Sequence, residues 1–326
     1  MKRIPFKDIV EAVRGAVRFE VTDGYLSFHR YTEEEYREYT PHDREALALK
    51  MPATSCVHIV FSTDSDTLSL RVRFRQASGR LFGDAIDILV DGKLYSSLGN
   101  QGKAQSELSQ RVELPKGEKR IHLVLPGLYS ASLGELSLAD GATFTAVKAK
   151  KRMLIYGDSI TQGYDAEHPS KSYANQLALA LDADAVCKAI GGEVFYPPLA
   201  KMDSGVADPA LITVAYGVND WHFGAHSEQE LFGNAKSFFD GLSEKYPSAR
   251  IFALSPIWTL DWEKENYIPF REIPALLSRA AGKGVTVIDC FPFVPHDPAL
   301  FRDGCLHPND EGYAHYANAL IAALGI

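Results

Sequence analysis

Residues 153–324 alternate short apolar runs with amphipathic segments, and this alternation limits the possible folds more than any other feature of the chain. Segments 172–181 and 231–246 have helical spacing and separate successive runs, and 313–324 follows the last one. Strands that alternate with helices pair in parallel, because each connection has to cross over the sheet. The pattern therefore predicts an α/β fold with a doubly wound, parallel five-stranded sheet. The apolar runs are 153–156, 185–190, 211–216, 251–254 and 285–288.

The first 150 residues have the pattern of β structure instead. In segment 68–75, apolar and polar residues alternate without a break, which is typical of a strand with one buried face. Segment 85–90 runs into Asp91-Gly92 and then 93–95, which is a hairpin signal. Short strands at this spacing predict an all-β sandwich. Further candidate strands lie at 57–61, 120–125 and 133–138.

A basic stretch at 148–152 separates the two patterns, so we expect a β-sandwich accessory domain at 1–148 and an α/β domain at 149–326. The charge-dense segment 33–39 is predicted to be an exposed helical turn or loop. Four cysteines without a CxxC pair argue against a disulfide framework and a zinc site. No secretory signal is apparent, and no apolar run approaches the roughly 20 residues that span a membrane. We therefore expect a cytoplasmic protein without membrane partners.

Charge is distributed unevenly along the chain. Residues 1–150 carry 21 Lys and Arg against 20 Asp and Glu, whereas residues 151–326 carry 13 against 22. An acidic second half would repel a phosphate backbone, which argues against nucleic acid as a partner. The imbalance weakly favours a neutral small-molecule substrate. The oligomeric state, including a homo-oligomer, is left open by the sequence.

Polar residues follow the predicted parallel strands, at the sheet edge where ligands bind in this class of fold. Gly157-Asp158-Ser159-Ile160 follows the first strand and Gly191-Gly192 the second. Gly217-Val218-Asn219-Asp220 follows the third, and segment 303–309 lies beyond the fifth. One rim is thus predicted to carry a serine, a glycine, an asparagine and an Asp/His pair.

These side chains are the ones that acyl transfer requires. His307 is a candidate base for the Ser159 hydroxyl, and Asp303 is a candidate to orient the imidazole. The oxyanion of a tetrahedral intermediate needs donors already in place. The backbone N–H groups of Ser159 and Gly192 and the amide of Asn219 are the candidates. The sequence therefore predicts a serine-based acyl transfer site.

In this order the four segments resemble the sequence blocks of the SGNH, or GDSL, hydrolase superfamily, with Ile160 in place of the usual leucine. The resemblance covers roughly residues 150–326. It implies a flavodoxin-like α/β/α fold and hydrolysis of a carboxylic ester, with no metal and no other cofactor. The first 150 residues resemble, in pattern more than motif, the jelly-roll-like β-sandwich module that precedes the catalytic domain in some two-domain SGNH esterases and in a related acyltransferase.

Two positions depart from the family pattern. Cys187 stands where the second block has an asparagine. Asp303 precedes His307 by four positions, whereas the family's acid precedes its histidine by three. Either the loop bulges by one residue, or His307 bonds to a backbone carbonyl group instead.

Three residues are weaker candidates for substrate binding. Trp258 and Trp262 follow the fourth strand and form either an aromatic wall for a sugar or acyl chain or ordinary packing. His222 and His226 are spaced as metal ligands on a helix, but Gly224 interrupts that helix. We therefore expect His222 in a loop near the pocket mouth.

The leading hypothesis is an esterase that forms an acyl-enzyme on Ser159 and acts on O-acetyl groups of a carbohydrate or on another small neutral ester. An acyltransferase would use the same residues, because water and an acceptor hydroxyl compete for one acyl-enzyme. A non-catalytic carbohydrate-binding protein is the third hypothesis, and the intact Ser159/His307 pair argues against it.

Overall fold

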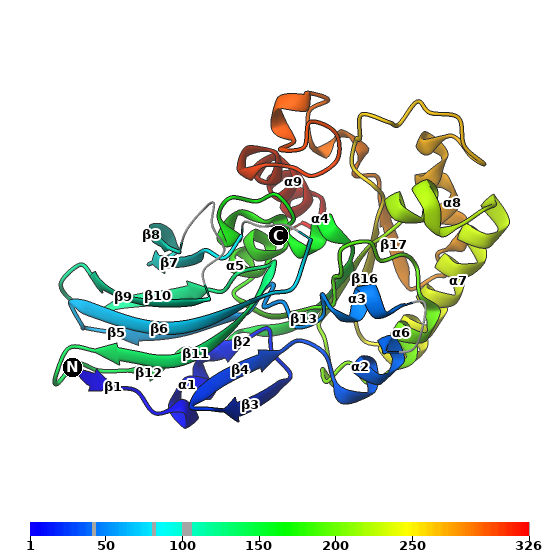
Figure 1. Cartoon of the computed structure of the whole chain (residues 1–326). Coiled ribbons are helices and arrows are strands. Elements are labelled where there is room, and N and C mark those ends of the chain that lie inside the picture. The colour runs from blue at the N-terminus through cyan, green and yellow to red at the C-terminus, as the bar shows by residue number, and fades with distance from the viewer. Residues whose placement is uncertain (41–43, 80–82, 100–105, 326) are drawn as a thin grey trace.

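The computed structural model describes residues 1–40, 44–79, 83–99 and 106–325. Its N-terminal part consists of two antiparallel sheets, and its C-terminal part contains a parallel sheet between helices (Figure 1). The helices are α1 (Phe6–Ala12), α2 (Glu33–Tyr39), α3 (Glu45–Ala48), α4 (Ser159–Gln162), α5 (Tyr173–Ala180), α6 (Pro197–Lys201), α7 (Glu228–Lys245), α8 (Ile273–Ala280) and α9 (Asp310–Ala323).

The two antiparallel sheets form the predicted β-sandwich. In β6, the side chains of Leu68, Leu70, Val72 and Phe74 are buried, and the arginines between them are partly or fully exposed. The alternation in the sequence thus reflects one face in the core and one in solvent. One sheet has the order β3 (Arg18–Thr22), β4 (Tyr25–His29), β11 (Tyr129–Leu138), β6 (Thr67–Gln76) and β9 (Glu107–Glu113), with β1 (Lys2–Arg3) beside β11. The other has the order β12 (Thr145–Ala146), β5 (His58–Thr63), β10 (Lys119–Val124), β7 (Ile86–Val90) and β8 (Lys93–Leu98), with β2 (Val13–Arg14) beside β5.

The parallel sheet confirms the predicted doubly wound fold. Strand order runs 2-1-3-4-5 among the described residues after position 150, the order of a flavodoxin-like sheet. Helices α5 and α9 pack on each other, and α7 packs against both α6 and α8. The carboxyl ends of the strands therefore share one edge, where the predicted site residues lie. The strands, in sheet order, are β14 (Ala183–Cys187), β13 (Lys151–Gly157), β15 (Leu211–Ala215), β16 (Arg250–Leu254) and β17 (Val285–Ile288).

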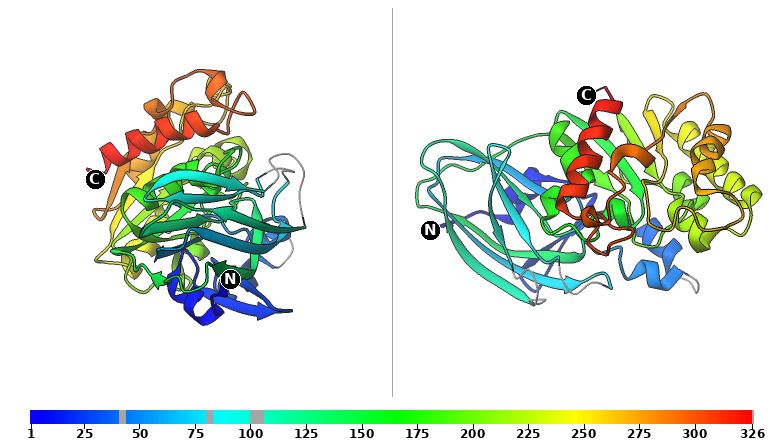
Figure 2. Two further views of the ribbon diagram at one scale, coloured as in Figure 1. Left: turned by 90° about the vertical axis from the view of Figure 1, so that its left-hand side faces the viewer. Right: turned by 90° about the horizontal axis from the view of Figure 1, so that it is seen from above.

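Segment 33–39 is helical, one of the two forms predicted for it, but it is only partly exposed. It forms α2, whose first turn is closed by a capping box between Thr32 and Glu35. Glu35 and Tyr39 are fully buried, and Tyr39 belongs to the hydrophobic core around the parallel sheet. The blue segment that carries α2 and α3 leaves the sandwich and lies against the C-terminal part (Figures 1 and 2). Its burial comes from a long-range contact that local sequence does not reveal.

None of the helices in the described part of the chain is both long and apolar enough to cross a membrane. All four cysteines are free thiols, and Cys56, Cys187 and Cys290 are buried.

Candidate active site

Ser159 lies at the first position of α4, directly after β13. The carboxylate of Asp158 caps this helix by accepting a hydrogen bond from the N–H of Ile160 at 2.9 Å. Burial raises the pKa of Asp158 to about 7, although its backbone hydrogen bonds oppose the shift. The Oγ atom of Ser159 lies 2.8 Å from Nε2 of His307. The predicted nucleophile and the predicted base are therefore within proton-transfer distance.

The loop that carries His307 explains the four-residue spacing to Asp303. Oδ1 of Asp303 accepts hydrogen bonds from the N–H groups of Cys305, Leu306 and His307, at 3.1, 2.8 and 3.0 Å. The backbone thus curls around the carboxylate, and a bridge between Phe301 and Pro308 closes the loop. Oδ2 lies 2.6 Å from Nδ1 of His307. The turn absorbs the extra residue, so the Asp303 carboxylate still reaches His307.

The electrostatic surroundings keep Asp303 ionised. Partial burial would raise the pKa of Asp303, but the hydrogen bonds from His307 and from the three backbone N–H groups lower it well below its usual range. A carboxylate beside Nδ1 fixes the imidazole tautomer in which Nε2 is free to accept the serine proton.

Two residues beside His307 were not predicted from the sequence. The ring of Tyr164 stacks on the imidazole, with centroids 5.5 Å apart. Oδ2 of Asp165, a buried residue, lies 3.9 Å from Nδ1 of His307. Both residues follow α4, within a few positions of Ser159. This closeness in the sequence is the feature from which their place near the site could be predicted.

The predicted oxyanion donors come from two neighbouring loops. Gly192 follows β14 and has a φ of +91°, a conformation that favours glycine. Asn219 follows β15 and is largely buried; its Nδ2 donates to the carbonyl oxygen of Glu193 at 2.9 Å. An amide nitrogen carries two N–H groups, so a second remains for a ligand. The bond to Glu193 ties the two loops together, while the oxyanion role of Gly192, Asn219 and Ser159 stays a prediction.

Replacing Asn219 with alanine is expected to lower kcat about 10²–10³-fold, or about 2.7–4 kcal/mol, the usual cost of losing one oxyanion donor. KM should change little, because the donor acts mainly in the transition state. The check is steady-state kinetics on an ester substrate. A folded variant with wild-type kcat would assign Asn219 to loop structure alone.

The three weaker candidates for substrate binding lie on segments other than those that carry Ser159 and His307. Trp258 is buried. Its ring stacks on that of His296, with centroids 5.5 Å apart, and contacts that of Phe301 in a tilted arrangement at 5.2 Å. Trp262 lines a surface pocket formed by residues 262–266 and 269–271, and neither Ser159 nor His307 lines it. The burial and ring contacts of Trp258 fit the alternative of ordinary packing, and a role of either tryptophan in substrate binding stays a prediction. His222 lies in a π-helical turn, Asp220–Gly224, and not in the expected loop.

Two groups of side chains in the described residues have ligand atoms spaced for a metal. One is Asp165, Asp303 and His307, and the other is Glu167, His168 and Asp310. Hydrogen bonds within each group account for both arrangements: His307 pairs with Asp303, and His168 with Asp310 at 2.7 Å.

Comparison with solved structures shows that the whole architecture recurs. A salicylyl-acyltransferase, SsfX3, from a tetracycline biosynthetic pathway has a TM-score of 0.79 and 24% identity, with 96% of this chain and 94% of that chain covered. A putative GDSL-like lipase from Bacteroides ovatus has a TM-score of 0.79 and 18% identity, with 99% and 97% covered. A family two carbohydrate esterase from Cellvibrio japonicus has a TM-score of 0.64 and 18% identity, with 97% and 95% covered.

At these identities the similarity establishes the fold alone, an α/β domain with a parallel sheet preceded by a β-rich N-terminal domain. Among curated proteins, none shows significant sequence similarity to the chain. The sequence of residues 155–315 matches the profile of the GDSL-like lipase/acylhydrolase family. This stretch includes Ser159, Gly192, Asn219, Asp303 and His307. Residues 155–315 are thus a domain of the GDSL-like lipase/acylhydrolase family.

Proposed function

We propose that the protein is a serine esterase that cleaves a carboxylic ester through an acyl-enzyme on Ser159. The observation that carries the proposal is the chain of hydrogen bonds from Ser159 Oγ to His307 Nε2 and from His307 Nδ1 to Asp303 Oδ2, at 2.8 and 2.6 Å. Helix capping does not explain the contact between Ser159 and His307, because Asp158 already caps α4. The arrangement does match what nucleophilic catalysis requires.

In the proposed reaction His307 Nε2 takes the proton of Ser159 as Oγ attacks the ester carbonyl carbon. The N–H groups of Ser159 and Gly192 and the Asn219 amide bind the oxyanion. The protonated His307 then gives its proton to the leaving alcohol, and the acyl-enzyme forms. Water, deprotonated by the same histidine, releases the carboxylic acid and restores Ser159.

The proposed substrate is a small neutral ester, with O-acetyl groups on a carbohydrate as the leading class. The net charge of the catalytic half disfavours polyanions, and carbohydrate esterases share the fold. A cytoplasmic location is part of the same proposal and is supported by the free cysteines. The proposal includes no nucleic-acid or membrane partner. Acyl transfer to an acceptor hydroxyl is the second candidate, because the acyltransferase SsfX3 aligns over 96% of this chain.

The test is hydrolysis of p-nitrophenyl esters from acetate to long acyl chains, together with intact-mass analysis after treatment with a fluorophosphonate. We expect turnover that is highest for short acyl groups and one phosphonyl adduct on Ser159. Turnover that rises on addition of an acceptor alcohol, with the acylated alcohol as product, would favour acyl transfer. A folded protein with neither turnover nor adduct would contradict the proposal.

A further inference from the structure

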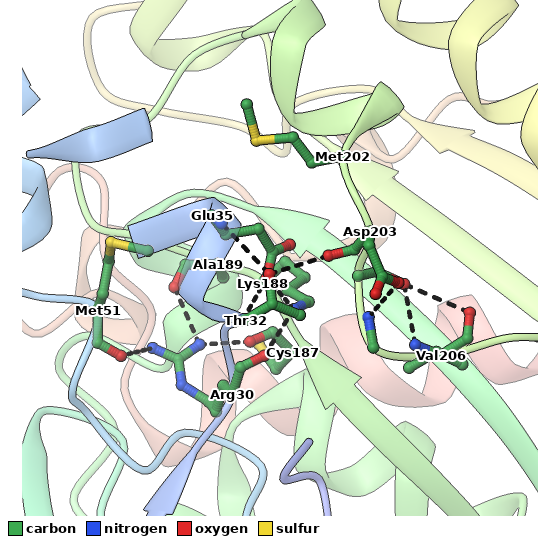
Figure 3. Close-up of polar contacts among 12 residues, drawn as sticks. Arg30, Thr32, Glu35, Met51, Cys187, Lys188, Ala189, Met202, Asp203 and Val206 are labelled. Carbon is green, nitrogen blue, oxygen red and sulfur yellow. Dashed lines mark hydrogen bonds and ion pairs between the residues drawn. The ribbon is translucent and has the colours of Figure 1, made fainter. Parts of the chain in front are cut away.

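The loop between β14 and α6, residues 188–196, is held by cationic side chains of the N-terminal domain. Arg30 is fully buried and donates to the carbonyl oxygens of Cys187 and Ala189, the second at 3.2 Å (Figure 3). Lys50 donates to the carbonyl oxygen of Gly191 at 2.5 Å. Alternate carbonyl groups along this segment therefore accept hydrogen bonds from the other domain.

The side chains of the same loop are paired with α2 and its neighbourhood. Lys188 Nζ lies 2.6 Å from Oε2 of Glu35, and both side chains are fully buried (Figure 3). The buried carboxylate of Glu193 accepts hydrogen bonds from Tyr39 at 2.5 Å and from Arg44 at 2.9 Å. The loop is thus anchored to the N-terminal domain on either side of Gly191 and Gly192.

Lys50 donates to the peptide unit that contains one of the proposed oxyanion donors, the N–H group of Gly192. The carbonyl group of Gly191 and the N–H group of Gly192 belong to the same planar peptide. A cation on the carbonyl oxygen fixes the orientation of that plane. It also withdraws electron density from the N–H group, which becomes a stronger donor. The preceding peptide is fixed separately, because the N–H of Gly191 donates to Oε1 of Gln162 at 2.7 Å.

The Lys50 side chain also lies close to Gly192 itself. A Cβ atom built on Gly192 would lie 3.6 Å from Nζ of Lys50 and 3.7 Å from Cδ2 of Leu47. Lys50 and Leu47 both come from the segment around α3. The N-terminal domain therefore reaches the residue that is proposed to bind the oxyanion.

We infer that Lys50 is a positioning residue of the proposed reaction, whose ammonium group holds the Gly191–Gly192 peptide with its N–H available to the oxyanion. The inference rests on the proposed function. It assigns the N-terminal domain a part in transition-state stabilisation and not only in covering the catalytic domain. Lys50 takes no part in proton transfer in this proposal, since its role is to donate a hydrogen bond to a carbonyl group.

The test compares Lys50→Met with Lys50→Arg in the full-length protein. Lys50→Met keeps an apolar chain of similar length and removes the donor, whereas Lys50→Arg keeps the charge and the N–H groups. We expect kcat to fall about 10–10²-fold in Lys50→Met, less than for loss of a whole oxyanion donor, with KM nearly unchanged. The rate of Ser159 phosphonylation by a fluorophosphonate should fall by a similar factor, and Lys50→Arg should recover most of both rates.

Lys2→Met is the matched control, because Lys2 also donates to a backbone carbonyl oxygen, that of Ala142, at 3.1 Å. It should retain wild-type rates, and thermal melting should show all variants folded. If Lys50→Met does not fold, Lys50→Gln takes its place. Wild-type kcat in the folded variant, or a loss that lies entirely in KM, would overturn the inference. If wild-type Ser159 is labelled by the probe, that failure concerns Lys50 alone; without labelling of the wild type, the proposed function fails as well.

Discussion

Ser159→Ala is expected to lower kcat for ester hydrolysis about 10⁶-fold, the order of magnitude found when a serine nucleophile is removed. The variant has no atom to form the acyl-enzyme, so only attack by water within the binding site remains. The fold should persist, because the change removes only one oxygen atom and one hydrogen bond, the one between Ser159 and His307. The measurement is the initial rate on the best p-nitrophenyl ester, with thermal melting alongside.

Ser278→Ala provides the matched control for Ser159→Ala. Ser278 lies exposed on α8, and its hydroxyl donates to the carbonyl oxygen of Pro274 at 2.9 Å. Its loss should leave kcat unchanged. Retention of more than a tenth of the wild-type rate in Ser159→Ala would assign the nucleophile elsewhere. The absence of a phosphonyl adduct in that variant would locate the adduct of the wild type on Ser159.

The sequence predicts much of this site because the carboxyl ends of parallel strands lie at one edge of the sheet, which brings the segments that follow successive strands together. Gly157 ends β13, and Gly191 and Gly217 lie in the loops that follow β14 and β15, so the residues that come next meet at the carboxyl ends of adjacent strands. The apolar runs that form these strands are local features, and so are the motifs behind them. The confirmed fold and the short distance between Ser159 and His307 follow from the same regularity.

Contacts between distant parts of the chain were beyond such reasoning. Glu35 lies in a charge-dense segment that predicts exposure, yet it is buried because Lys188, 153 positions away, pairs with it. Trp258 is a residue type that often lines ligand sites, but its ring packs on Phe301. The local sequence does not indicate whether a tryptophan in a loop faces a ligand or the protein interior. The spacing of Asp303 was ambiguous because turn geometry depends on three backbone hydrogen bonds that residue types alone do not specify.

Asp303→Asn is expected to lower kcat about 10⁴-fold with little change in KM, because it traps His307 in the wrong tautomer. The three N–H groups that bind Oδ1 require an oxygen at that position. The introduced amide must therefore turn its NH₂ group toward Nδ1 of His307. Nδ1 then becomes an acceptor and the proton moves to Nε2, which can no longer accept the proton of Ser159.

Asp165→Asn separates this mechanism from a general effect of negative charge near His307. Oδ2 of Asp165 lies 3.9 Å from Nδ1, compared with 2.6 Å for Oδ2 of Asp303, so only the nearer carboxylate accepts a direct hydrogen bond. Steady-state kinetics should show a far smaller loss for Asp165→Asn than for Asp303→Asn. The reverse order would make Asp165 the acid that orients His307. The turn around Asp303 would then serve only to place the histidine, since its backbone hydrogen bonds to Oδ1 persist in the amide variant.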